Sequence, residues 1–267
     1  MRKAHKKSVA LSDSKLGAAN STADRAIDIL LIFSEGRPIW GATEIAAYFD
    51  MPRSTTQRYI NSLRSYALIV EDEGGGYRLG PKIFPLARTA KASTSIVKIA
   101  ASHLRNLNAL FGEAIVLYQR VGQEIVALDH FESKHPVVVA YPQGHMLPWP
   151  ATASARVLLA FLNQTEQVAL FRVMSPIQYT KRTIVSTKKL GEALARIRRD
   201  GYAFSDQERV EGVRAVAAPI FSQGEGCYCL TLSGLSFRLT ERRLPKVIAE
   251  VKATASRISD DLRTVEY

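Results

Sequence analysis

The sequence predicts an α+β protein in two parts, a small helical part followed by a larger antiparallel sheet flanked by helices. Three observations indicate this class. Residues 42–79 read as two short helices joined by a tight turn and followed by two short strands. Beyond residue 111, segments with the apolar pattern of strands alternate with segments that have the pattern of helices. The length of 267 residues leaves room for two domains.

The first part is predicted to be a winged helix–turn–helix. Its first helix covers about residues 22–33, because apolar residues recur there at helical spacing and a Gly-Arg-Pro sequence follows. The acidic, glycine-rich residues 71–76 permit a tight reversal between two short strands. The other elements are a helix over 43–49, a turn over 50–52, a helix over about 52–65, and wing strands over 68–70 and 77–79.

The third helix carries the polar and basic side chains expected of a helix that enters the DNA major groove. Arg53 and Arg58 can contact phosphate or a guanine edge, and Gln57 can pair with adenine. The wing offers Tyr77 and Arg78, although phosphate would repel its acidic tip. The alternative is a three-helix domain that binds protein or pads the core. The candidate DNA-binding residues are Thr43, Arg53, Ser54, Thr55, Gln57, Arg58, Asn61 and Arg78.

The chain is divided by these patterns into a basic disordered tail (1–20), the winged helix–turn–helix domain (21–82), a linker helix (83–110) and a mixed α/β domain (111–267). A GAF-like or PAS-like sensor domain has a similar order of elements, an antiparallel sheet flanked by helices. The predicted strands are 114–120, 124–131, 136–141, 202–204, 214–221 and 227–234, and the predicted helices are 151–162, 190–201 and about 240–264.

A small-molecule pocket is predicted where residues 147–156 enter a helix through small side chains. A helix N-terminus offers free N–H groups and a partial positive charge, so it can hold a carboxylate. Thr231 and Ser233 alternate on one predicted strand and therefore share a face, and Ser205 follows another short strand. The alternative is that the small residues only allow the helix to pack tightly on the sheet.

The net charge of +11 and the pI of about 9.7 favour a polyanionic partner, of which nucleic acid is the usual one. No apolar run approaches the ~20 residues that a membrane span needs, so no membrane partner is expected. The two cysteines, Cys227 and Cys229, are two apart in a predicted strand. A structural disulfide is therefore not expected, and a reducing cytoplasm is favoured.

The motifs of common enzyme classes are absent from the sequence. It contains no Gly-x-Ser-x-Gly elbow, no phosphate-binding Gly-x4-Gly-Lys-Ser loop and no His-Glu-x-x-His. The histidines lack metal-ligand spacing, although a site assembled from distant positions stays open. We therefore expect no catalytic residue, no metal and no cofactor.

The chain resembles the IclR family of bacterial transcriptional regulators from about residue 22 to residue 264. The most specific match is residues 201–221, where Gly201, Ser205 and Glu208 have the spacing of the family pattern, whereas Ser222 replaces its usual Asp or Asn. Other matching segments are 23–33, 43–63, 77–88 and 147–162.

The resemblance implies a winged-helix DNA-binding domain, a linker helix and a C-terminal effector-binding domain that takes a small organic acid. It also implies a homodimer or a dimer of dimers. Ala155 stands where a glycine is common, and the sequence around residues 180–184 looks like the branch that responds to aromatic acids. The implied effector-binding residues are Ala153, Ser154, Ser205, Ala215, Thr231 and Ser233.

The sequence thus predicts a cytoplasmic transcription factor that binds an operator in double-stranded DNA and responds to a small organic acid, for which an aromatic acid is one candidate. Two alternatives stay open. One is an enzyme that keeps a degenerate DNA-binding module. The other is an effector-free architectural DNA binder, which is favoured if Trp149 or Tyr141 fills the pocket.

Overall fold

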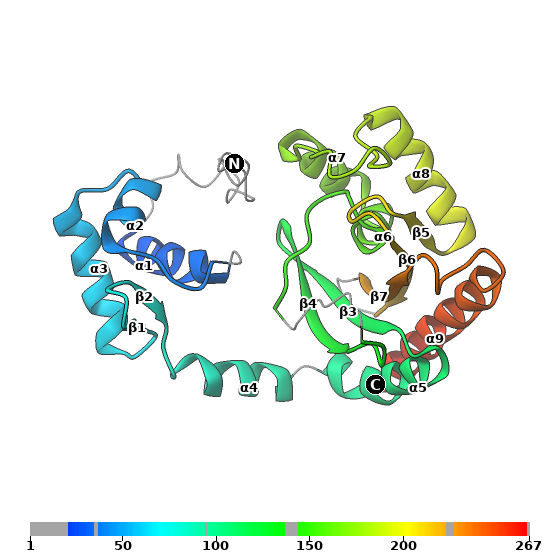
Figure 1. Ribbon diagram of the computed structural model, residues 1–267, viewed down its shortest axis with the longest axis horizontal. Coiled ribbons are helices and arrows are strands. Elements are labelled where there is room, and N and C mark those ends of the chain that lie inside the picture. The colour runs from blue at the N-terminus through cyan, green and yellow to red at the C-terminus, as the bar shows by residue number, and fades with distance from the viewer. Residues whose placement is uncertain (1–20, 35–36, 94, 137–143, 223–226, 266–267) are drawn as a thin grey trace. The chain divides into compact units, whose positions relative to one another are not determined.

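The structure is a computed structural model that describes residues 21–34, 37–93, 95–136, 144–222 and 227–265 (Figure 1). The chain forms two compact units, Met1–Ser93 and Thr94–Tyr267. The basic tail predicted over residues 1–20 lies outside the described residues. Each unit has its own buried apolar core, so each is described by itself.

The first unit has the predicted winged helix–turn–helix. Helix α1 begins at a capping box, in which the Ser21 hydroxyl accepts from the Asp24 N–H and the Asp24 carboxylate accepts from the Ser21 N–H. Its core contains the fully buried Ile29, Ile45 and Ile60. The elements are α1 (Thr22–Leu31), the 3₁₀ helix η2 (Ile32–Ser34), α2 (Ala42–Tyr48), α3 (Arg53–Ser65), β1 (Ile69–Glu71), β2 (Tyr77–Leu79) and α4 (Ile83–Ser93).

The wing is attached closely to the helices. Trp40 and Tyr77 exchange backbone hydrogen bonds of 3.0 and 2.8 Å, which add the segment before α2 to the edge of the wing. Gly80 lies so close to the α3–β1 turn that a Cβ there would be 2.2 Å from the Ala67 carbonyl oxygen. Tyr77 is buried against this core, so the expectation that the wing exposes it was wrong.

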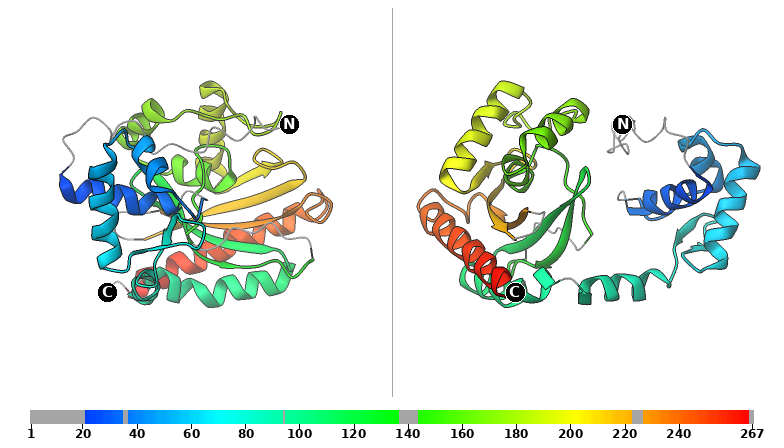
Figure 2. Two further views of the ribbon diagram at one scale, coloured as in Figure 1. Left: turned by 60° about the vertical axis from the view of Figure 1, so that its left-hand side comes forward. Right: turned by 180° about the vertical axis from the view of Figure 1, so that it is seen from behind.

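The second unit contains, among the residues described, a five-stranded antiparallel sheet with the order β4-β3-β7-β6-β5. This confirms the predicted class. Helices α5 and α9 cover one face of the sheet, and α6 and α8 cover the other (Figures 1 and 2). The elements are α5 (Ser95–Phe111), β3 (Ala114–Val121), β4 (Glu124–Phe131), α6 (Ala153–Ala160), α7 (Gln164–Val173), α8 (Thr187–Asp200), β5 (Ala203–Asp206), β6 (Val213–Phe221), β7 (Cys227–Leu235) and α9 (Leu244–Val265).

Strand β3 separates the two cores of this unit. Successive side chains on a strand point to opposite faces, so Ile115 and Leu117 pack with α5 and α9, whereas Val116 and Tyr118 pack with α6 and α8. Each β3 residue that packs in one core is therefore next in sequence to a residue that packs in the other core.

The region expected to be a linker helix over residues 83–110 is helical on both sides of residue 94, which lies outside the described residues. The structure has α4 before residue 94 and α5 after it. Helix α5 belongs to the core of the second unit, because Ala100, Leu104 and Leu107 repeat at helical spacing and are buried against the sheet. Helix α7 was not predicted, and residues 137–141 of the strand expected over 136–141 lie outside the described residues.

A buried ion pair closes one end of the sheet. Glu113 is fully buried, and its two carboxylate oxygens accept from Arg238 at 2.7 and 2.8 Å. The carboxylate also lies over Gly234, where a Cβ would be only 2.5 Å from Glu113 Oε2. The glycine therefore makes room for the ion pair, which joins the start of β3 to the turn after β7.

Replacing Glu113 with alanine should lower the free energy of unfolding of the second unit by about 3 kcal/mol. The reason is that the Arg238 guanidinium would stay largely buried without the carboxylate that compensates its charge. Urea unfolding followed by circular dichroism measures this loss. The control is Arg199→Ala, which breaks a fully exposed pair with Asp200 and should leave the unfolding midpoint unchanged. Equal losses in the two variants would contradict the prediction.

Candidate functional site: an exposed helix and a hydroxyl-lined cavity

Helix α3 is fixed to the first unit by one face and exposes the other. Thr56, Ile60 and Leu63 are buried, and the Thr56 hydroxyl bonds back to the Pro52 carbonyl at 3.2 Å. The residues predicted to contact DNA lie on the remaining surface of α3, at the start of α2 and on β2. They are the exposed Thr43, Arg53, Ser54, Arg58, Asn61 and Arg78 and the partly exposed Thr55 and Gln57.

Several of these side chains are held in place by one another. Arg53 Nη2 donates to Thr43 Oγ1 at 2.8 Å, which ties the start of α3 to the start of α2. Gln57 Nε2 donates to Asn61 Oδ1 at 3.0 Å across one helical turn. Arg58 has no hydrogen-bond or ion-pair partner among the described residues, so its guanidinium is available to a ligand.

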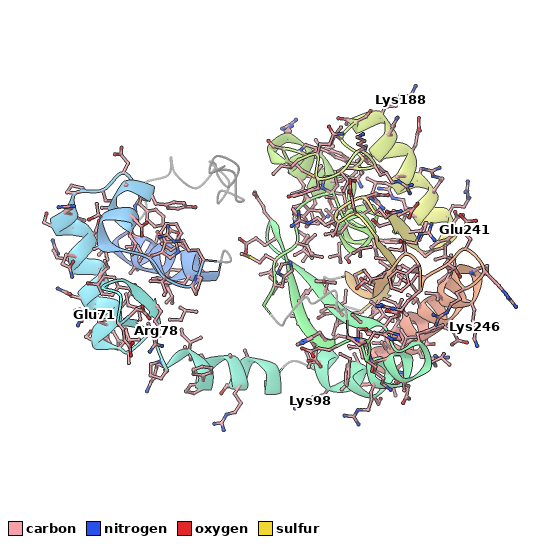
Figure 3. All side chains as sticks on the ribbon, viewed as in Figure 1. Glu71, Arg78, Lys98, Lys188, Glu241 and Lys246 are labelled. Carbon is pink, nitrogen blue, oxygen red and sulfur yellow. The ribbon has the colours of Figure 1, made fainter. Side chains whose placement is uncertain are left out.

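The wing carries charges of both signs. Arg78 lies 3.6 Å from Asp72, and Arg64 of α3 lies 3.0 Å from Glu71 (Figure 3). Both arginines are thus partly neutralised by wing carboxylates, whereas Arg58 is not. Of the arginines on α3 and the wing that the structure describes, Arg58 alone has no hydrogen-bond or ion-pair partner.

A small cavity opens in the second unit between the start of α6 and the strands β5, β6 and β7. Its volume is about 30 Å³, which is room for roughly two waters. It therefore holds only a small ligand unless its walls move. The lining residues are Tyr118, Leu147, Thr152, Ser154, Ser205, Arg209, Val210, Val213, Ala215, Thr231 and Ser233.

The pairing of the strands brings distant residues together in this cavity. Ser205, Ala215 and Ser233 are direct neighbours across β5, β6 and β7 in the antiparallel register. Ser154 of α6 lies above them, with its Oγ 2.9 Å from Thr231 Oγ1. Ser205, Ala215, Thr231 and Ser233 were all predicted from the sequence, and so was Ser154.

Two polar features of the cavity point to a ligand. The Oγ of Ser233 is buried and has no hydrogen-bond partner among the described residues, although such a group normally has one. Helix α6 begins at Thr152, whose hydroxyl accepts from the Ala155 N–H at 3.1 Å. The N-terminal end of α6, with its partial positive charge, therefore faces the same space.

A buried ion pair between Arg156 and Glu208 holds the start of α6 in place. Arg156 binds the Glu208 carboxylate with two guanidinium nitrogens and donates to the Phe204 carbonyl oxygen at 2.9 Å. Burial raises the pKa of the Glu208 carboxyl, and the Arg156 guanidinium opposes that rise. The pair joins α6 to β5 and to the segment that follows β5.

Some lining residues were not predicted, and one predicted residue does not line the cavity. Ala153 is buried in α6 but is not part of the lining. Leu147 and Thr152 belong to the segment 147–156 that was predicted to form the pocket. The lining residues that the sequence did not indicate lie on β3, in the β5–β6 connection and at the start of β6. They are Tyr118, Arg209, Val210 and Val213.

Comparison with known proteins identifies the family. Residues 22–73 match the IclR helix-turn-helix domain, and residues 89–260 match the domain described as "Bacterial transcriptional regulator IclR C-terminal". The chain belongs to the IclR family.

Individual relatives are similar over nearly their whole length. The HTH-type transcriptional regulator XynR of Escherichia coli is 30% identical over 225 residues, which are 84% of this chain and 89% of XynR. The crystal structure of an IclR-type regulator from Alicyclobacillus acidocaldarius has a TM-score of 0.80 at 23% identity and covers 90% of this chain and 97% of that one. An IclR homologue from Microbacterium hydrocarbonoxydans, complexed with 4-hydroxybenzoate, has a TM-score of 0.76 at 20% identity and covers 91% and 100%.

Membership of the IclR family decides between the classes that the sequence left open. The chain is a DNA-binding transcriptional regulator, and the enzyme alternative is set aside because its relatives are regulators. Among the helices that the structure describes, none is long and apolar enough to cross a membrane. The DNA contacts of individual residues and the identity of an effector are matters for proposal.

Arg58→Ala should weaken binding to a specific DNA site by about 1–3 kcal/mol if Arg58 contacts a base, and equally on all sequences if it contacts only phosphate. Fluorescence anisotropy with a site selected from random DNA, repeated at several salt concentrations, separates the two cases. Lys188→Ala, which removes one positive charge from α8 (Figure 3), is the control and should bind as the wild type does. Wild-type affinity for Arg58→Ala at every salt concentration would refute the contact.

Proposed function

We propose that this IclR-family regulator changes its affinity for an operator when a small organic acid binds in the cavity beside α6. The observation that carries the proposal is the buried, unpartnered Ser233 Oγ among the described lining residues. Leaving a buried hydroxyl without a partner costs free energy, and a ligand with an oxygen or N–H group would recover that cost. A pocket used only for packing would have no need of such a hydroxyl.

An acid suits the cavity better than a neutral or cationic ligand. The start of α6 presents a partial positive charge, and Ser205, Ser233 and one member of the hydrogen-bonded Ser154–Thr231 pair can donate a hydroxyl proton. The homologue from Microbacterium hydrocarbonoxydans, which has the same fold, was crystallised with an organic acid, 4-hydroxybenzoate. That relative supports the ligand class for this chain, but not the ligand.

On the DNA side, we assign the contacts to the exposed surface of α3. Arg58 would bind a phosphate or guanine, and the hydrogen-bonded pair of Gln57 and Asn61 would face base edges. Arg53, held by Thr43, would contact the DNA backbone near the start of the helix. A homodimer or dimer of dimers would place two such helices on paired half-sites, in the cytoplasm.

The switch would be a shift in population between two conformations of the regulator. An effector changes DNA affinity only if it binds one conformation more tightly than the other, and DNA must then change effector affinity by the same factor. Binding of the effector would therefore depend on DNA concentration, which a simple carrier of organic acids would not show.

The effector-free alternative requires a filled pocket. Trp149 does not line the cavity, because its indole N–H is bonded to the Gln123 carbonyl oxygen at 2.7 Å. Tyr141, the other candidate for filling it, lies outside the described residues. The open space beside Ser233 therefore favours a regulator that binds a ligand over the effector-free alternative.

Ser233→Ala should weaken binding of an effector acid about tenfold while leaving the apo protein as stable or slightly more stable, because it removes an unpaired buried hydroxyl. The acid is found by screening a panel of short and aromatic acids for a rise in melting temperature, and calorimetry then measures its affinity. Ser259→Ala is the matched control. Its hydroxyl is fully bonded, to Phe221 N–H and the Ala255 carbonyl, so this variant should lose stability and keep its affinity.

The panel also tests the proposal as a whole. A positive result is an acid that raises the melting temperature and changes the affinity for the selected DNA site. The proposal fails if DNA binds but no acid in the panel changes either quantity.

A further inference from the structure

We infer that Arg209 binds the carboxylate of the effector, and that this effector is a short acid whose second oxygen group meets the hydroxyls that line the cavity. The inference rests on the proposed function, which it narrows to one cation and one class of ligand. Arg209 is the one charged residue among the described residues that line the cavity.

The charges around the cavity explain why Arg209 is available. The neighbouring carboxylates already have cations, since Asp206 is bound by Arg182 and by Arg214 and Glu208 is bound by Arg156. Arg209 has no carboxylate within ion-pair distance in the part of the chain that the structure describes. A guanidinium that lines a partly buried cavity without an anion is a natural site for a ligand carboxylate.

The Arg209 side chain is held in a fixed plane. Its guanidinium lies over the ring of Tyr179, with the central carbon 3.8 Å from the ring centroid. A stacked guanidinium keeps its edge N–H groups free, and these match the two oxygens of a carboxylate. The stacking partner is itself fixed, because Tyr179 N–H donates to Thr183 Oγ1, which donates to the Glu208 carbonyl oxygen at 2.6 Å.

His145 does not compete for the role of cation. Burial lowers the pKa of its imidazole, and the charge on Arg209 lowers it further. The imidazole is therefore neutral at pH 7, and the positive charge at the cavity is that of Arg209.

The hydroxyls that line the cavity call for a second polar group on the ligand. Ser233 Oγ is unpartnered among the described residues, and the Ser154–Thr231 pair lies beside it. Apolar side chains, Leu147 and Val213, complete the wall. The small volume of the cavity favours a short acid of about two to four carbons that carries a hydroxyl or keto oxygen, and the walls must move outward to admit even this ligand.

Three related probes separate the two ends of the ligand. Lactate carries both groups, lactamide lacks the carboxylate and propionate lacks the hydroxyl. Calorimetry on the full-length wild-type protein should show lactate binding at least about tenfold more tightly than either of the others. Glycolate, pyruvate and 2-hydroxybutyrate, tested in the same way, establish the preferred chain length.

The variants assign the two contacts. Arg209→Gln should remove most of the preference for lactate over lactamide, a loss of about 10- to 100-fold in lactate affinity, and Arg209→Lys should recover part of it. Ser233→Ala should remove the preference for lactate over propionate instead. Arg182→Gln, which removes a nearby cation that does not line the cavity, should bind all three probes as the wild type does.

Each outcome has one meaning. If Arg209→Gln binds the short acids as tightly as the wild type does, or if only long or aromatic acids bind the wild type, the inference is overturned while the proposed function stands. If no acid of any length binds the wild type, the proposed function itself fails. Loss of binding in both Arg209→Gln and Arg182→Gln would show a general charge effect and would also overturn the inference.

Discussion

The buried ion pair between Arg156 and Glu208 is the constraint on which the cavity depends. It fixes the first turn of α6 to the segment after β5, and Glu208 also accepts through its carbonyl from Thr183. The neighbouring residue, Arg209, is thereby placed in the lining of the cavity. A buried ion pair adds little net stability, but it stabilises only the arrangement in which its two charges meet. Such a pair can therefore fix the relative positions of the separate elements that form the cavity.

The same geometry offers a route from the cavity to the rest of its unit. Tyr118 lines the cavity, while its neighbour on β3, Leu117, packs in the core formed with α5 and α9. A ligand that shifts Tyr118 must therefore disturb the packing of α5, because a close-packed core does not absorb such a shift. Helix α5 follows α4 along the chain, so this route ends at the segment that joins the two units.

Sequence reasoning succeeded where the signal was local and failed where it was not. The winged helix–turn–helix follows from neighbouring residues, and all the polar positions predicted on α3 are at least partly exposed. Ser205 and Ser233 were proposed from their places on or after predicted strands, but the family resemblance was needed to group them with Ala215, since their adjacency depends on strand pairing. No sequence pattern marks Arg209, because loop residues have no periodic spacing. The ring on which its guanidinium stacks, that of Tyr179, lies thirty positions earlier in the chain.

Among the described residues the buried hydroxyl of Ser233 has no partner, and under the proposed function this lowers the stability of the ligand-free state in favour of ligand binding. A buried hydroxyl without a partner costs about 1–3 kcal/mol, and an alanine at this position would avoid that cost. The next strand has an alanine, Ala215, directly beside it, so a small apolar residue is tolerated there. A serine at this position lowers the free energy of unfolding unless a ligand binds its hydroxyl for part of the time. Such a local conflict between sequence and stability is expected at a binding site and not in an ordinary core.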